Sequence, residues 1–149
     1  MDEQKPKTLV SAEENADVSR AVRQWLNMYP DKPLSKLDFE WLGEKSGLCI
    51  STIQAAYKTK QFIDGSYQAQ YQMKLIYRVP AKNADERMSA DEVLDAYGAW
   101  AEANVDSLTI ADGIRVRKVK RDTAAALFAR YEGDVEDHQI LLTLIYEVI

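Results

Sequence analysis

A single histidine and a single cysteine are the side chains best suited to acid–base or nucleophilic chemistry in this chain. His138 follows Asp137, and a carboxylate beside an imidazole can act as an acid–base pair. Catalysis requires several groups that converge on one point, and the sequence offers no further member of such a set. We expect His138 to make local hydrogen bonds where a turn meets a strand, and Cys49 to be a partly buried structural thiol. The sequence therefore predicts no catalytic residue and no enzymatic activity.

Acidic side chains gather in one short segment near the C-terminus, where they could hold a hard cation. The acidic segment comprises Glu132, Asp134, Glu136 and Asp137. Carboxylate oxygens suit such cations, but the ligand order and the glycine of an EF-hand loop are missing. One Cys and one His are too few for a zinc site, and no glycine-rich phosphate loop is present. We expect a solvated turn here, and neither a metal nor a cofactor.

A run of basic residues is the best candidate for contact with nucleic acid. The run consists of Arg115, Arg117, Lys118, Lys120 and Arg121. The formal net charge of the chain is −5, whereas proteins that grip the phosphate backbone carry clustered positive charge. No helix-turn-helix, zinc or RNA-binding signature accompanies the run. We favour the solvent face of a strand, where Lys and Arg prevent edge pairing, and keep nucleic-acid contact as the alternative.

Length and composition indicate one folded domain. The chain has 149 residues, of which 46% are hydrophobic and 29% charged, the usual balance of a domain with a single core. Residues 1–12 are charged, contain Pro6 and lack periodicity, so we expect a flexible N-terminal arm before a domain at 13–149. The polar N-terminus predicts no signal peptide, and no apolar run is long enough to span a membrane, so we expect no membrane partner.

Two segments have the apolar periodicity of helices. The first should be capped at Ser11, in a capping box with Glu14, or at Asp17, and should end before Pro30. The second should begin at the capping box that starts with Ser89. Their apolar stripes consist of Val18, Ala21, Val22, Trp25, Leu26 and Tyr29, and of Val93, Leu94, Tyr97, Trp100 and Ala101.

Alternating patterns predict the strands of a sheet. The expected strands lie at 37–41, 48–62, 67–79, 114–119 and 138–148, with a hairpin turn at Asp64 and Gly65. The phase of 48–62 is ambiguous, which a β-bulge would explain, and another break lies near Arg117 and Lys118. Segment 123–131 is open between a short helix and a strand. We expect an α+β fold: a twisted, mainly antiparallel β-sheet with two helices packed on one face.

Four stretches of the chain carry a resemblance to a known family. They are 18–30, beginning Val-Ser-Arg-Ala-Val-Arg-Gln-Trp; 53–57, Ile-Gln-Ala-Ala-Tyr; 65–78, beginning Gly-Ser-Tyr-Gln-Ala-Gln-Tyr-Gln; and 131–148, beginning Tyr-Glu-Gly-Asp-Val-Glu-Asp-His-Gln-Ile. In this order they resemble tail terminator, or tail-to-head joining, proteins of siphophages and prophages of Gram-positive bacteria, also labelled minor capsid proteins. None of the stretches is a catalytic signature, so the resemblance rests on their collinearity from about residue 17 onward.

The resemblance implies a structural protein of the virion. Such a subunit forms a ring, a hexamer, that caps the head-proximal end of the tail tube after assembly in the cytoplasm of the host bacterium. The ring stops tube polymerisation and joins the tail to the head connector, with DNA as transient cargo through its lumen. The implied partners are further copies of the chain, the tail tube protein and the head-completion or stopper protein. Another head–tail connector subunit is the alternative within the virion.

Three parts of the sequence are the expected contact regions of this ring subunit. They are the hairpin at Asp64 and Gly65, the glutamine face at Gln68, Gln70 and Gln72, and the acidic segment from Glu132 to Asp137. Two interpretations of the glutamine face stay open, a lining for a DNA duct and an ordinary solvated sheet face.

Overall fold

A seven-stranded sheet with two helices forms the part of the chain that the structure, a computed structural model, describes, which is residues 8–149. The elements are β1 (Thr8–Leu9), α1 (Ala12–Leu26), β2 (Asp38–Phe39), β3 (Gly47–Gln61), β4 (Tyr67–Pro80), α2 (Ala84–Ala103), the 3-10 helix η1 (Val105–Ser107), β5 (Ile114–Arg121), β6 (Ala126–Tyr131) and β7 (Val135–Val148). Apart from the parallel pair β2–β3, neighbouring strands run antiparallel. The predicted α+β fold is confirmed.

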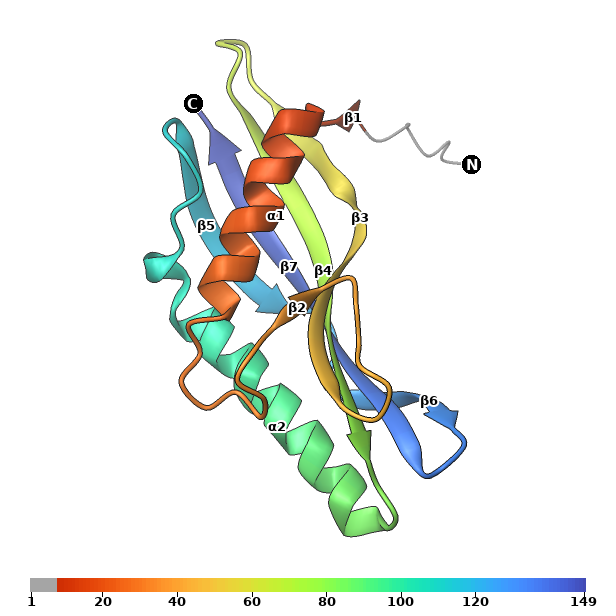
Figure 1. Cartoon of the computed structure of the whole chain (residues 1–149). Helices are drawn as coiled ribbons and strands as arrows, with labels where there is room; N and C mark the ends of the chain where they lie inside the picture. Colours follow the sequence, from red (N-terminus) through yellow and green to blue (C-terminus); the bar gives the residue numbers. More distant parts are fainter. Residues whose placement is uncertain (1–7) are drawn as a thin grey trace, which may run out of the picture.

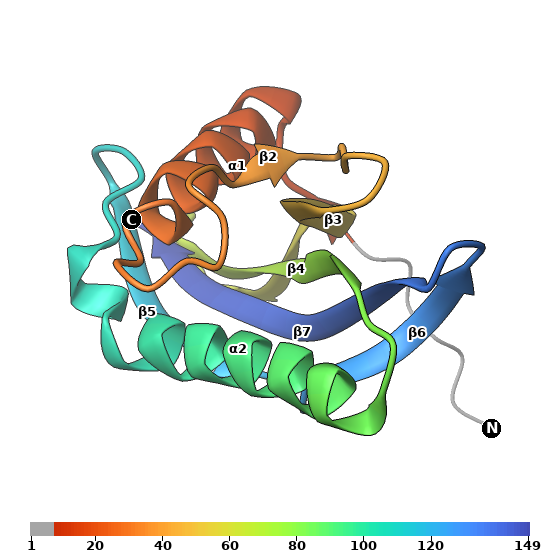
Figure 2. The same ribbon diagram turned by 60° about the horizontal axis from the view of Figure 1, so that its bottom comes forward.

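The strand order places β7 in the middle of the sheet. Along the main path the order is β1-β3-β4-β7-β5, and β2 pairs with the start of β3. The side of β7 away from β4 is shared by two strands, because β6 pairs with its first part and β5 with its second part. Figure 2 shows β7 crossing the molecule between its neighbours. A central position explains why apolar residues occur on both faces of β7.

Both helices lie on the same face of the sheet, as expected (Figure 1). The hydroxyl groups of Tyr67 and Tyr146, on this face of β4 and β7, donate hydrogen bonds to the Glu14 carboxylate of α1. Gly98 of α2 lies against Ile140 on the same face of β7. The helices also contact each other through aromatic rings. The ring centroids of Trp25 and Trp100 are 5.5 Å apart, and those of Tyr29 and Tyr97 are 4.5 Å apart. The hydrophobic core fills the space between the helices and the sheet.

Asparagine and serine side chains cap the two helices. Ser11 accepts a hydrogen bond from the backbone N–H of Glu14 at 3.1 Å, which confirms the first of the two predicted caps. The second helix is capped six residues before the predicted Ser89, because Asn83 accepts from the backbone N–H of Glu86 at 3.0 Å. Asn83 thus supplies the cap for an acidic first turn, and Ser89 lies inside the helix.

Part of the expected N-terminal arm belongs to the sheet. Thr8 and Leu9 pair with Lys58 and Tyr57 of β3, and Val10 is buried. The expected arm therefore extends too far: Thr8 and Leu9 pair with a sheet edge that the local sequence does not reveal, and residues 11 and 12 cap and begin α1. The rest of the predicted arm, residues 1–7, lies outside the described residues.

Two irregular segments and one short strand complete the comparison with the expected elements. Register shifts within β3 explain its ambiguous phase, and a shift between Val116 and Lys118 in β5 lies at the predicted break. The open segment 123–131 forms strand β6 at 126–131. The expected strand at 37–41 is reduced to β2, which pairs with β3 through two residues. Among residues 8–149, no helix is both long and apolar enough to cross a membrane.

Candidate functional site

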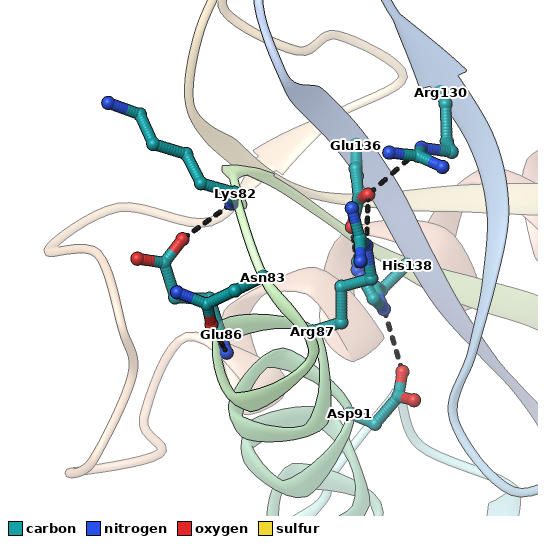
Figure 3. Close-up of polar contacts among 8 residues, drawn as sticks. All are labelled: Lys82, Asn83, Glu86, Arg87, Asp91, Arg130, Glu136 and His138. Carbon is teal, nitrogen blue, oxygen red and sulfur yellow. Dashed lines mark hydrogen bonds and ion pairs between the residues drawn. The ribbon is translucent and has the colours of Figure 1, made fainter.

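His138 lies in a buried charged cluster between α2 and β7 (Figure 3). Its Nδ1 atom is 2.7 Å from a carboxylate oxygen of Asp91, and its Nε2 atom is 3.2 Å from one of Glu136. Both ring nitrogens are therefore engaged by carboxylates, and the imidazole is shielded from solvent. Glu136 is a local partner of the kind expected for His138, whereas Asp91 belongs to α2, which is distant in sequence. The geometry describes a structural contact between helix and strand.

Glu136 is a buried carboxylate held by two arginines. The Nε atom of Arg87 lies 2.6 Å from its Oε2 atom, and the Nε atom of Arg130 lies 3.1 Å from the same oxygen. Burial alone raises the pKa of Glu136, but hydrogen bonds from Arg87 and His138, with the charges of Arg87 and Arg130, bring that pKa below its usual value. Glu136 is therefore a charged member of the fold and is inaccessible to a partner.

Asp137 points to the opposite face of β7 and is 2% exposed. Its carboxylate receives two hydrogen bonds from the Arg78 guanidinium, at 2.7 and 2.8 Å, and one from the Tyr131 hydroxyl at 2.9 Å. The prediction of a solvated acidic turn is wrong for Glu136 and Asp137, because β7 already begins at Val135. The other two acidic residues of the segment are exposed in the turn.

Like Asp137, Cys49 lies on the face of the sheet opposite the helices, which we call the helix-free face. The loop at 40–46 covers one end of this face and buries the cysteine. Burial, assisted by the nearby charge of Glu40, raises the pKa of Cys49 to about 11. The thiol is therefore protonated and poorly nucleophilic at neutral pH. Within residues 8–149, no group of three or more His, Cys, Asp or Glu side chains is arranged to hold a metal ion.

The part of the helix-free face beyond this loop carries the three predicted glutamines and three residues of the basic run. Directly paired residues of neighbouring strands point to the same side of a sheet. The register therefore defines three rows across β3, β4, β7 and β5: Lys60–Gln68–Glu147–Arg115, Tyr57–Gln70–Ile145–Lys118 and Gln54–Gln72–Thr143–Lys120. We call these three rows the open polar face. The glutamines and the basic run, separate in sequence, are here two strands apart on one surface.

Hydrogen bonds tie the glutamines of the open polar face to their neighbours on β3. The side-chain amide of Gln54 donates to Gln72 at 2.6 Å, and the hydroxyl of Tyr57 donates to Gln70 at 3.0 Å. The basic side chains of β5 in these rows are exposed, whereas the glutamines are half-buried. The surface thus consists of hydrogen-bonded amide side chains with exposed cationic side chains along one side.

Positive charge prevails on the open polar face, although the chain as a whole is acidic. Within its three rows the single acidic side chain is Glu147, and this carboxylate is 2.9 Å from the Nε atom of Arg117. The bulge in β5 sets this arrangement. It turns Arg121 to the helix face, where its Nε atom lies 2.6 Å from a carboxylate oxygen of Glu102. Arg121 is therefore separated from the rest of the basic run.

The predicted hairpin turn lies at one end of the sheet, away from the charged cluster. Asp64 accepts hydrogen bonds from the backbone and hydroxyl of Ser66, and these bonds lower the pKa of the Asp64 carboxyl. Gly65 has a φ of +91°, a conformation that glycine adopts without strain. The hairpin extends beyond the other elements at the top of Figure 1. Phe62 and Ile63 of this hairpin are exposed; Phe62 was not recognised as a candidate because an apolar residue at the end of an expected strand suggests a core position.

The sequence matches no protein-family model and no curated protein sequence.

Proposed function

We propose that the chain is a phage tail terminator, a subunit of a hexameric ring that binds the head-proximal end of a tail tube. The ring stops tube polymerisation, joins the tail to the stopper or head-completion protein, and is located in the virion. The single observation that supports this proposal best is the open polar face. It joins the predicted glutamine face and most of the basic run on one surface that neither helix of residues 8–149 covers.

A surface of this kind suits the wall of a duct through which DNA moves. Amide groups can hydrogen-bond to water and to phosphate without a net charge, and dispersed cations attract the phosphate backbone weakly. A strong, continuous cationic surface would retain DNA, whereas an apolar surface would not hydrate it. The interleaving of glutamines with Thr143, Ile145 and basic residues lies between these extremes.

The mechanism would consist of binding alone. A ring forms when two different patches on each subunit meet and the rotation closes. One side of the ring would copy the docking surface that a tube ring presents, while its other side would not, so that no further tube subunit adds. The buried positions of His138, Glu136 and Cys49 support a structural role over a catalytic one.

Polymerisation of the tail tube protein in the presence of the purified chain tests this function. Electron microscopy should show tubes that carry a ring at one end and whose length stops increasing once the ring is bound. Tubes grown without the chain give the reference length. Tubes that keep lengthening with bare ends at saturating concentrations of the chain would rule the proposal out.

A nucleic-acid-binding protein is the second candidate, and one observation favours it: Arg115, Lys118 and Lys120 point from the same face. Counterion release makes such binding weaken steeply with salt. Measurement of DNA affinity between about 50 and 200 mM salt separates the two candidates, because that range changes the affinity of a protein with 6–10 phosphate contacts by about 10³–10⁵-fold. A tail terminator should bind weakly throughout, whereas a dedicated DNA-binding protein should be tight at low salt.

A further inference from the structure

Among the exposed apolar side chains of the described residues, two pairs lie near opposite ends of the sheet. The hairpin patch consists of Phe62 and Ile63, and the β6 patch of Phe128 and Tyr131, whose rings lie near Lys74 and Arg78 on the face of the sheet opposite the helices. In Figure 1 the hairpin is at the top and β6 at the lower right. Strand β4, which links the two ends, has 14 residues, a span of about 45 Å at the usual rise per residue. The two patches therefore cannot meet within one molecule.

The β6 patch lies on the sheet edge that is least protected against pairing. Strand β6 pairs with β7 on one side, and no strand of residues 8–149 pairs with its other side. The edge of β3 is closed by β1, by β2 and by side chains, since Glu40 accepts from the backbone N–H of Thr52 and Asn15 accepts from that of Ala56. The edge of β5 carries a basic run, which discourages pairing.

By contrast, β6 has the sequence Ala-Leu-Phe-Ala-Arg-Tyr, with one charged residue. That residue, Arg130, is held by the buried Glu136 at 3.1 Å. An exposed apolar edge of this kind is a ready docking site for another polypeptide. Figure 2 shows the β6–β7 hairpin extending to the side of the molecule, where a second protein can reach it.

The net charges beside the two patches have opposite signs. Lys58 and Lys60 precede the hairpin patch on β3, whereas Glu132 and Asp134 follow β6 in the exposed β6–β7 turn. The side chains of Lys60, Glu132 and Asp134 make no ion pair among the described residues. The Asp64 carboxylate also lies in the hairpin turn, where Ser66 donates two hydrogen bonds to it, so two lysines and one carboxylate flank the hairpin patch and two carboxylates follow the β6 patch. Complementary charge of this kind favours a head-to-tail encounter between copies and disfavours like ends.

We propose that the hairpin patch of one copy docks on the β6 patch of a second copy of this chain. Phe62 and Ile63 pack against Phe128 and Tyr131, and Lys60 faces the acidic β6–β7 turn. The contact is heterologous, so each copy uses both of its ends and successive copies can close into a ring. This inference rests on the proposed ring function and adds to it the surface that joins neighbouring subunits.

Two variants, each defective at one end, test the contact. Ile63→Asp removes the hairpin patch and Phe128→Asp removes the β6 patch, and both side chains are exposed enough for the fold to tolerate the change. Sedimentation and native mass measurement should show oligomers for the unchanged chain and monomers for each variant alone. An equimolar mixture should form a heterodimer of twice the monomer mass and nothing larger, because one intact hairpin patch meets one intact β6 patch.

Trp41→Asp provides the matched control, because Trp41 is as exposed and apolar but belongs to neither patch. This variant should assemble like the unchanged chain, and circular dichroism should show the same fold for all the variants. Monomers in the mixture, assembly of either variant alone, or an unchanged chain that is monomeric at about 100 μM, well above the Kd of a stable complex, would overturn the proposed contact. A chain that behaves as predicted but leaves tube growth unaffected would overturn the tail-terminator function and leave the contact intact.

Discussion

Replacement of Arg78 by Met should destabilise the fold strongly, because it would leave the buried Asp137 carboxylate without a countercharge. Arg78 supplies two hydrogen bonds to that carboxylate and one, at 2.9 Å, to the backbone carbonyl of Gly43. Its side chain is 19% exposed and that of Asp137 is 2% exposed, so solvent screens the pair weakly. Removal of one partner from a buried ion pair costs about 3–5 kcal/mol. The remaining hydrogen bond from Tyr131 offsets about 1 kcal/mol of this loss.

Urea denaturation measures the effect directly. A loss of about 3 kcal/mol, with a slope of about 2 kcal/mol per molar urea, lowers the unfolding midpoint by about 1.5 M. The double variant Arg78→Met, Asp137→Leu is the matched control. It should recover most of the loss, because it removes the stranded charge and keeps the volume apolar. A midpoint shift below about 0.5 M for Arg78→Met, or a double variant less stable than the single one, would refute the reasoning.

Three further predictions concern single positions. The free energy of unfolding should fall as the pH drops below the usual carboxyl pKa of 4.5, because the lowered pKa of Glu136 means that the folded state stabilises its charged form. Urea midpoints between pH 3 and pH 7 measure this fall, and Glu136→Gln should make it smaller. The thiol of Cys49, with its pKa raised to about 11, should react with a thiol reagent at pH 7 only at the rate of unfolding, and reaction within seconds in native buffer would contradict its burial. Asn83→Ala should cost about 1 kcal/mol in thermal or urea unfolding through loss of the helix cap, whereas Ser89→Ala should be close to neutral.

Local patterns in the sequence predicted the elements well where one strong signal dominated. The alternation along 67–79 identified β4 and its buried face, and Ser11, one of the two predicted caps, caps the start of α1. These signals depend on neighbours a few residues away. The helix start at Asn83 was missed because Ser89 offers an equally good capping sequence, and only packing of the whole helix selects between them.

The candidate site could be predicted only in its separate parts. That Gln68 and Arg115 lie in one row depends on β7 pairing with both β4 and β5, and a local pattern carries no information on strand order. The bulge in β5 shifts the side-chain alternation by one residue, which places Arg121 on the helix face. The counterions of Glu136 and Asp137 were hidden for a related reason, because two of them, Arg78 and Arg87, come from distant elements.

Cryo-electron microscopy of a tail tube with the chain bound at its end tests the central claim most directly. We predict a closed ring in which Gln68, Gln70 and Gln72 and the basic residues of β5 face the lumen, while the hairpin of each subunit contacts β6 of the next. A bare tube end, or a ring whose lumen is lined by the helices while the open polar face points outward, would contradict the account.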